Sequence, residues 1–277
     1  MAVFAMVSAK GSPGVTTTAL VLAMTWPRPA VVAECDPAGG DVLAGYLGGS
    51  VTSARGLLGT AATSRAGSTA DINKELVALD REGTRLVLPG VTDPGQARAL
   101  STRWTALANV FAGLRLGDAA TDVVADCGRL EAAGTPVPVL RRADMVVLVV
   151  RSTLRSVRAA QGWATRLRDD LAAHGAGGGR LYVLLVGDGQ PYRHDDVVAH
   201  LGLPSLGVVA WDPKTAAVFS DGARRGRGFT RSPLARTAAA VGGRLRRLTE
   251  ADRGDPASTS PRRWQKQPTA EMRAGHG

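Results

Sequence analysis

The chain has 277 residues, of which 44% are hydrophobic and 4% aromatic, and its formal net charge is +10. This length is enough for one large α/β domain with a sizeable core. No apolar run reaches the roughly 20 residues of a membrane-spanning helix, and no basic segment precedes an apolar one at the N-terminus, so we expect no signal peptide. The two cysteines, Cys35 and Cys127, cannot form a disulfide framework, which favours a cytoplasmic protein.

Short apolar runs rich in β-branched residues alternate with helical or loop segments along the chain. Most of them are continuously apolar, which is typical of parallel strands covered by helices on both faces. We therefore expect a doubly wound, mostly parallel α/β sheet. The runs are residues 3–7, 30–34, 85–88, 122–126, 145–150, 181–186 and 207–210.

The domain is expected to span residues 1–250, followed by a disordered Pro/Arg-rich tail over residues 251–277. A short helix is expected near residues 72–79. Ser232 is a plausible N-cap for the last helix, with Pro233 at its first helical position.

Residues 8–18 join the first predicted strand to a helical stretch, which is the setting of a phosphate-binding loop. Such a loop acts through backbone N–H groups and a helix N-terminus. The usual loop ends Gly-Lys-Ser/Thr, whereas this one reads Gly14, Val15, Thr16. The magnesium-binding hydroxyl is retained. The lysine is lost, and because a charge-assisted hydrogen bond contributes about 1.5–3 kcal/mol, its loss predicts phosphate binding about ten- to a hundred-fold weaker. The alternative is a tight strand–helix turn that binds nothing.

Carboxylates stand at the ends of two further predicted strands. Glu34 and Asp36 end one of them, and Asp126 ends the other. Ligands of such sheets bind beyond the carboxyl ends of the strands, where carboxylates can hold magnesium or orient an attacking water. The three motifs in this order predict a nucleotide site more strongly than any one of them does.

Together the motifs resemble the deviant Walker A P-loop ATPases of the ParA/MinD group. Their loop reads Lys-Gly-Gly-x-Gly-Lys-Thr-Thr and is followed by Asp-x-Asp-Pro and Asp-x-Pro/Gly. The resemblance runs in order from Met1 to about Leu248, and the degenerate loop is most similar to the CpaE/TadZ-type members, which help to place pilus or secretion machinery. It implies binding of ATP and Mg²⁺, a nucleotide-dependent homodimer, and a switch that positions or assembles a partner machine.

The resemblance also implies a role for each matching position. Lys10 matches the signature lysine that reaches the phosphates of the partner subunit, and Asp36 matches the carboxylate that positions the attacking water. Thr16 and Asp126, the Walker B acid, match the magnesium ligands. The implied nucleotide-binding residues are Lys10, Gly11, Ser12, Gly14, Val15, Thr16 and Thr17.

The chain departs from the pattern of the group at two positions. Val15 replaces the loop lysine, which predicts weak or absent hydrolysis. Glu34 replaces the first aspartate of its pair and keeps a carboxylate one methylene further out. For the adenine contacts, Asp188 is the first position to test.

Arginines concentrate near the C-terminal end, where residues 222–247 hold eight of them and no acid, and so carry +8 of the +10. Such a cluster favours an anionic partner, either DNA or an acidic membrane surface. A solvated face, or an arginine-rich composition that reflects a GC-rich genome, is the alternative. The candidate patch is Arg224, Arg225, Arg227, Arg231 and Arg236.

The leading hypothesis is an ATP-binding switch of the MinD/ParA type, recruited from the cytoplasm to the nucleoid or the inner membrane face. The alternatives are a pseudo-ATPase scaffold that works without nucleotide, and a partition-type ATPase that binds DNA nonspecifically. The last helix is expected to pack on the core rather than on a membrane, because its apolar face lacks aromatic residues. The cysteines are expected to be buried on strands and the histidines to lie at the surface.

Overall fold

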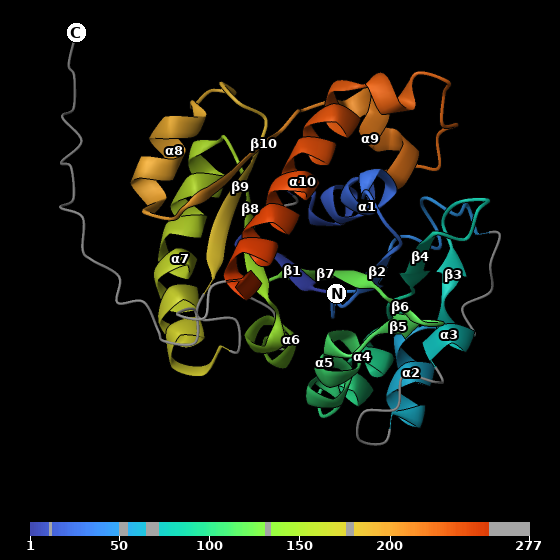
Figure 1. The fold of residues 1–277 in the computed structure, drawn as a ribbon. Coiled ribbons are helices and arrows are strands. Elements are labelled where there is room, and N and C mark those ends of the chain that lie inside the picture. The colour runs from blue at the N-terminus through green and yellow to red at the C-terminus, as the bar shows by residue number, and fades with distance from the viewer. Residues whose placement is uncertain (11–12, 50–54, 65–71, 131–133, 176–179, 255–277) are drawn as a thin grey trace, which may run out of the picture.

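The structure is a computed structural model that describes residues 1–10, 13–49, 55–64, 72–130, 134–175 and 180–254 (Figure 1). Within these residues, eight strands form one sheet in the order β10-β9-β8-β1-β7-β2-β4-β3. Neighbouring strands pair in parallel except for β3, which pairs antiparallel with β4. The strands are β1 (Val3–Ser8), β2 (Ala30–Glu34), β3 (Val77–Ala78), β4 (Arg85–Leu88), β7 (Asp122–Arg129), β8 (Met145–Arg151), β9 (Leu181–Val186) and β10 (Ser205–Val209).

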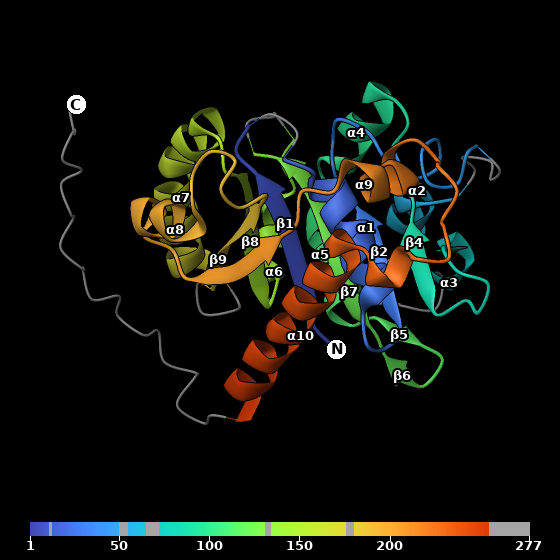
Figure 2. The same cartoon turned by 90° about the horizontal axis from the view of Figure 1, so that it is seen from above.

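Helices cover both faces of the sheet, as a doubly wound α/β fold requires. Figure 1 shows α1 (Val15–Thr25), α9 (Pro213–Ser220) and α10 (Pro233–Gly254) together on one face, and Figure 2 shows the same three helices lying across the strands. Residues of the remaining helices join the hydrophobic cluster of the opposite face. These helices are α2 (Leu57–Thr63), α3 (Ile72–Glu75), α4 (Pro94–Leu100), α5 (Trp104–Ala112), α6 (Val137–Arg142), α7 (Leu154–His174) and α8 (His194–Leu201).

The core is divided by the sheet into two hydrophobic clusters. Along β1, Val3, Ala5 and Val7 belong to one cluster, while Phe4 and Met6 belong to the other. Both faces of the strand are therefore buried, which is why its sequence is continuously apolar rather than alternating.

The predicted helix over residues 72–79 is wrong in its second half. Helix α3 ends at Glu75, and residues 77 and 78 form β3 at the sheet edge. The backbone N–H of Leu79 donates to the carbonyl of Arg85 at 2.7 Å, so pairing with β4 outcompetes local helix propensity. A small hairpin of β5 (Arg115–Leu116) and β6 (Ala119–Ala120) was also not predicted.

The last helix begins as the sequence predicts. The Ser232 hydroxyl accepts the Ala235 N–H at 3.2 Å, and Pro233 is the first helical residue. The apolar face packs against α1 and β10, with Leu234 and Leu245 buried. The helix runs to Gly254, and the rest of the predicted tail, residues 255–277, lies outside the described residues. Among the described residues, no helix is long and apolar enough to cross a membrane.

A buried carboxylate at the amino edge holds the two central strands together. Asp122 accepts the Ala2 N–H at 2.8 Å, the Trp26 Nε1–H at 2.9 Å and the Arg28 Nε–H at 2.7 Å. Burial would raise the pKa of Asp122, but the hydrogen bonds from Arg28 and Trp26 outweigh it and leave this pKa lowered. The contacts anchor β7 beside β1, and the opposite ends of these strands carry the candidate site.

Candidate functional site

A left-handed glycine forms the turn between β1 and α1. Gly14, the N-cap of α1, has φ of 88°, a conformation that side chains with a Cβ rarely adopt. Its carbonyl accepts the Thr18 N–H at 2.8 Å and so closes the first helical turn. The first N–H groups of α1 consequently remain available at the carboxyl edge of the sheet, as an anion-binding helix N-terminus requires.

The position of the missing lysine is part of the core. Val15 is only 7% exposed and packs in the cluster beneath α1, so the chain gains packing where a phosphate-binding lysine would extend. Lys10 is exposed at the start of the loop. Gly11 and Ser12, which the sequence places in the nucleotide site, lie outside the described residues.

The predicted magnesium ligands are in direct contact. The Thr16 hydroxyl donates to Oδ2 of Asp126 at 2.5 Å. Met6 and Asp126 are register partners in the β1–β7 pair, so the sheet itself brings the loop and the acid together. Asp126 is buried and also accepts the Gly128 N–H at 3.0 Å. Burial raises the pKa of Asp126 to about 6, although the hydrogen bonds from Thr16 and Gly128 oppose the shift.

Asp36 lies beside this pair, at the end of β2. Its Oδ1 accepts the Ala38 N–H at 2.8 Å, and burial raises its pKa. Its carboxylate packs against Gly128, where a Cβ would stand 2.1 Å from the Asp36 Cγ. Gly128 also has φ of 63°, so both the space and the backbone require glycine at this position. The structure therefore brings Asp36, Asp126 and Thr16 to one edge of the sheet.

Glu34, which replaces the first aspartate of its motif pair, makes structural hydrogen bonds to two loops. Its carboxylate is buried and accepts the N–H groups of Val42 at 3.0 Å and Gly90 at 3.1 Å. Burial raises the pKa of Glu34 to about 7, with these hydrogen bonds opposing the shift. The carboxylate thus ties the segment after β2 to the segment after β4.

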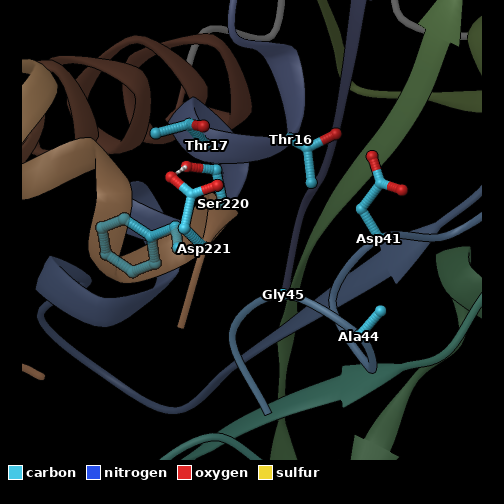
Figure 3. A pocket seen from close by; sticks show the side chains of 8 residues that line it. Thr16, Thr17, Asp41, Ala44, Gly45, Ser220 and Asp221 are labelled. Atoms are coloured by element: carbon cyan, nitrogen blue, oxygen red, sulfur yellow. Dashed lines mark hydrogen bonds between the residues drawn. The ribbon is translucent and has the colours of Figure 1, made fainter. Parts of the chain in front are cut away.

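A pocket of about 430 Å³ opens beside Thr16 and Thr17 (Figure 3). Its walls come from the start of α1, the segment after β2 and the end of α9. The last two walls are in close contact, because a Cβ on Gly45 would stand 2.8 Å from the Ser220 carbonyl oxygen. Sequence reasoning missed these walls, since only long-range packing places them. They consist of Asp41, Ala44, Gly45, Phe219, Ser220 and Asp221.

Two other predicted features lie away from the pocket lining. Asp188 is exposed after β9 and accepts the His194 N–H at 2.7 Å, so it supports the start of α8. The arginines of the candidate patch, Arg224, Arg225, Arg227, Arg231 and Arg236, are all exposed.

The cysteines and most histidines behave as ordinary structural residues. Cys35 and Cys127 are buried at strand ends, as predicted. His174 is exposed, but His194 and His200 are half-buried, and Nε2 of His194 lies 2.6 Å from the Ser205 hydroxyl. The expectation of surface histidines is thus confirmed for His174, whereas His194 and His200 are only partly exposed, and His276 lies outside the described residues.

Among the described residues, no group of three His, Cys, Asp or Glu side chains could hold a metal ion. Mg²⁺ keeps several waters and commonly binds through one or two protein oxygens plus substrate phosphates. The oxygens of Thr16 and Asp126 fit this donor set, with phosphate and water oxygens as the remaining ligands.

The comparisons with known proteins place this geometry in a known fold. No protein-family model matches the sequence, and no curated protein matches it. Among solved structures, the chain is similar to a ParA family ATPase from Chlorobium tepidum TLS, with a TM-score of 0.69 and 17% identity over 88% of this chain and 98% of that one. The MinD cell division protein of Aquifex aeolicus gives a TM-score of 0.66 and 17% identity over 89% and 97%.

A third similar structure was solved with a nucleotide. The septum site-determining protein MinD of Pyrococcus horikoshii OT3, in complex with Mg-ADP, gives a TM-score of 0.66 and 14% identity over 90% of this chain and 98% of that one. The fold is therefore that of the MinD/ParA P-loop NTPases, as the sequence predicts. Identities this low show the fold and leave the function to be argued from the site.

Proposed function

We propose that this chain is a nucleotide-responsive switch of the MinD/ParA type. It binds ATP with Mg²⁺ at the loop, and the bound nucleotide promotes a homodimer that completes a surface for a partner machine. The observation that carries the proposal is the 2.5 Å contact between the Thr16 hydroxyl and the buried Asp126 carboxylate, at the N-terminus of the helix that follows the glycine turn.

Each side chain at this edge has a separate proposed role in nucleotide binding. Thr16 and Asp126 would hold Mg²⁺, which neutralises phosphate charge when bound. Thr17 and the first N–H groups of α1 would bind phosphate oxygens. Asp36 would orient an attacking water, and Lys10 would reach the nucleotide of the partner subunit.

Burial of Val15 limits what the site can do. Its side chain belongs to the core and cannot neutralise charge on the transferred phosphate, so we propose weak binding and slow or absent hydrolysis. Such a protein would act mainly through nucleotide occupancy rather than turnover, and its degenerate loop is most similar to those of the CpaE/TadZ-type members. The same observation also favours the second candidate, a pseudo-ATPase scaffold that docks partners without nucleotide.

The exposed arginine patch favours a further alternative, nonspecific DNA binding by a partition-type ATPase. Counterion release makes such binding fall steeply with salt. This alternative is excluded if the protein does not bind DNA. It is also excluded if the affinity for DNA is the same at 50 and 200 mM salt, roughly the range over which such contacts weaken.

Titration of the full chain with a fluorescent ATP analogue and Mg²⁺ tests the switch, and light scattering with and without Mg-ATP tests the dimer. The switch predicts saturable binding and nucleotide-dependent self-association that Lys10→Ala abolishes. An absence of binding at millimolar nucleotide (a Kd of 1 mM corresponds to about 4 kcal/mol of binding free energy), together with self-association that Lys10→Ala does not change, would leave the pseudo-ATPase scaffold as the remaining function.

A further inference from the structure

The proposed site is rich in acids and poor in cations. Asp36, Asp126 and Asp41 converge on the edge where phosphate would bind. The negative charges of Asp36 and Asp41 help to raise the pKa of Asp126, and the charge of Asp41 helps to raise that of Asp36. Lys10 is the one lysine or arginine in residues 8–18, and the proposed dimer directs it toward the partner subunit. A nucleotide bound in the same subunit therefore needs a second source of positive charge.

Arg129 stands next to the loop. It is the last residue of β7, and its register partner is Ser8, the residue with which β1 ends and the loop begins. The pairing is reinforced by the Leu130 N–H, which donates to the Ser8 carbonyl at 2.9 Å. Arg129 follows Gly128 directly and lies three residues beyond Asp126.

The side chain of Arg129 is directed away from the core. The seven preceding residues of β7 are buried, and Arg129 alone in this strand is exposed. Its positive charge acts on Asp36, lowering the pKa of that carboxyl against the larger effect of burial. The guanidinium is thus within electrostatic reach of the carboxylate that packs on Gly128.

From this placement we propose that Arg129 binds the terminal phosphate of a nucleoside triphosphate in its own subunit, in place of the lysine that Val15 replaces. The inference rests on the proposed function and names the residue that supplies its missing charge. A guanidinium suits this role because it stays charged and binds phosphate oxygens through two parallel N–H groups. The matched motif that begins at Asp126 ends at Gly128, and the resemblance assigns no role to Arg129.

The test compares Arg129→Gln and Arg129→Lys with Arg158→Gln, a matched control at an exposed position of α7. Mg-ATP and Mg-ADP are titrated into each full-length variant by calorimetry, and thermal unfolding verifies the fold. Arg129→Gln should weaken Mg-ATP binding about ten- to a hundred-fold and Mg-ADP binding much less. Arg129→Lys should keep part of the affinity, Arg158→Gln all of it, and adding Val15→Lys to Arg129→Gln should restore Mg-ATP binding.

Each other outcome points to a specific failure. If the unsubstituted protein binds Mg-ATP and Arg129→Gln binds it equally well, the role of Arg129 is refuted while the proposed function stands. Equal weakening of Mg-ATP and Mg-ADP refutes the assignment to the terminal phosphate. If the unsubstituted protein binds neither nucleotide, the proposed function fails and the role of Arg129 fails with it.

Discussion

The Thr16 hydroxyl and the Asp126 carboxylate lie 2.5 Å apart, although 110 positions separate them in the sequence. The contact joins the first turn of α1 to the end of β7, and it depends on the parallel register of β1 and β7. Because burial keeps the pKa of Asp126 at about 6, the pair holds a carboxylate whose charge is poorly stabilised by the protein alone. A divalent cation bound there would stabilise the charged form.

Thr16→Val tests the metal half of this pair. The substitution keeps the branched shape and removes the hydroxyl, so it should weaken nucleotide binding in the presence of Mg²⁺ by about tenfold or more and leave binding in EDTA unchanged. Thr25→Val, at the other end of α1, is the matched control, because the Thr25 hydroxyl donates to the Val21 and Leu22 carbonyls of its own helix. A Thr16→Val protein with unaltered magnesium dependence would exclude Thr16 as a ligand.

Gly128→Ala tests whether Asp36 is held by the close approach at β7. The new methyl group would stand 2.1 Å from the Asp36 Cγ, so it should displace the carboxylate and lower any ATP turnover. Gly202→Ala is the control, because Gly202 has a similar φ of 59° but nothing within 4 Å of its Cβ position. Both changes incur about 1–2 kcal/mol of left-handed strain, and urea unfolding should show the larger loss of stability for Gly128→Ala. Equal losses would contradict the packing of Asp36 on Gly128.

Glu34 should make stability depend on pH near neutrality. Its pKa is raised to about 7 in the folded chain, against about 4.3 when unfolded, so the folded state binds the proton more tightly. Stability then falls as pH rises from about 4.3 through 7, by an amount on the order of 3 kcal/mol. Glu34→Gln cannot titrate, and its unfolding free energy should change less between pH 5 and pH 8 (roughly the window bracketed by these pKa values). Parallel pH profiles for the two proteins would contradict the shift.

The sequence predicted the central architecture because the relevant signals are local. Continuous apolar runs identified β2 and β9 at their observed bounds, and the Ser232 cap marked the start of α10. The edge strand β3 escaped prediction, since its two residues gain strand geometry only by pairing with β4.

The site was predicted in part for the same reason. Thr16, Asp36 and Asp126 belong to strand-end motifs that a sequence displays directly. The walls formed by Asp41 and Asp221 depend on packing between the segment after β2 and α9, which no local pattern encodes. The capture of the Glu34 carboxylate by loop N–H groups also depends on the fold, because one donor, Gly90, lies 56 positions away.

The most direct test of the central claim, that this loop is a phosphate-binding site weakened by Val15, is calorimetric titration of Mg-ATP into the unsubstituted protein and Val15→Lys. We expect measurable binding by the unsubstituted protein and an affinity about ten- to a hundred-fold higher in the variant, the effect of one regained charge-assisted hydrogen bond. If the unsubstituted protein does not bind Mg-ATP and the folded variant does not bind it either, the loop is a strand–helix turn and not a nucleotide site.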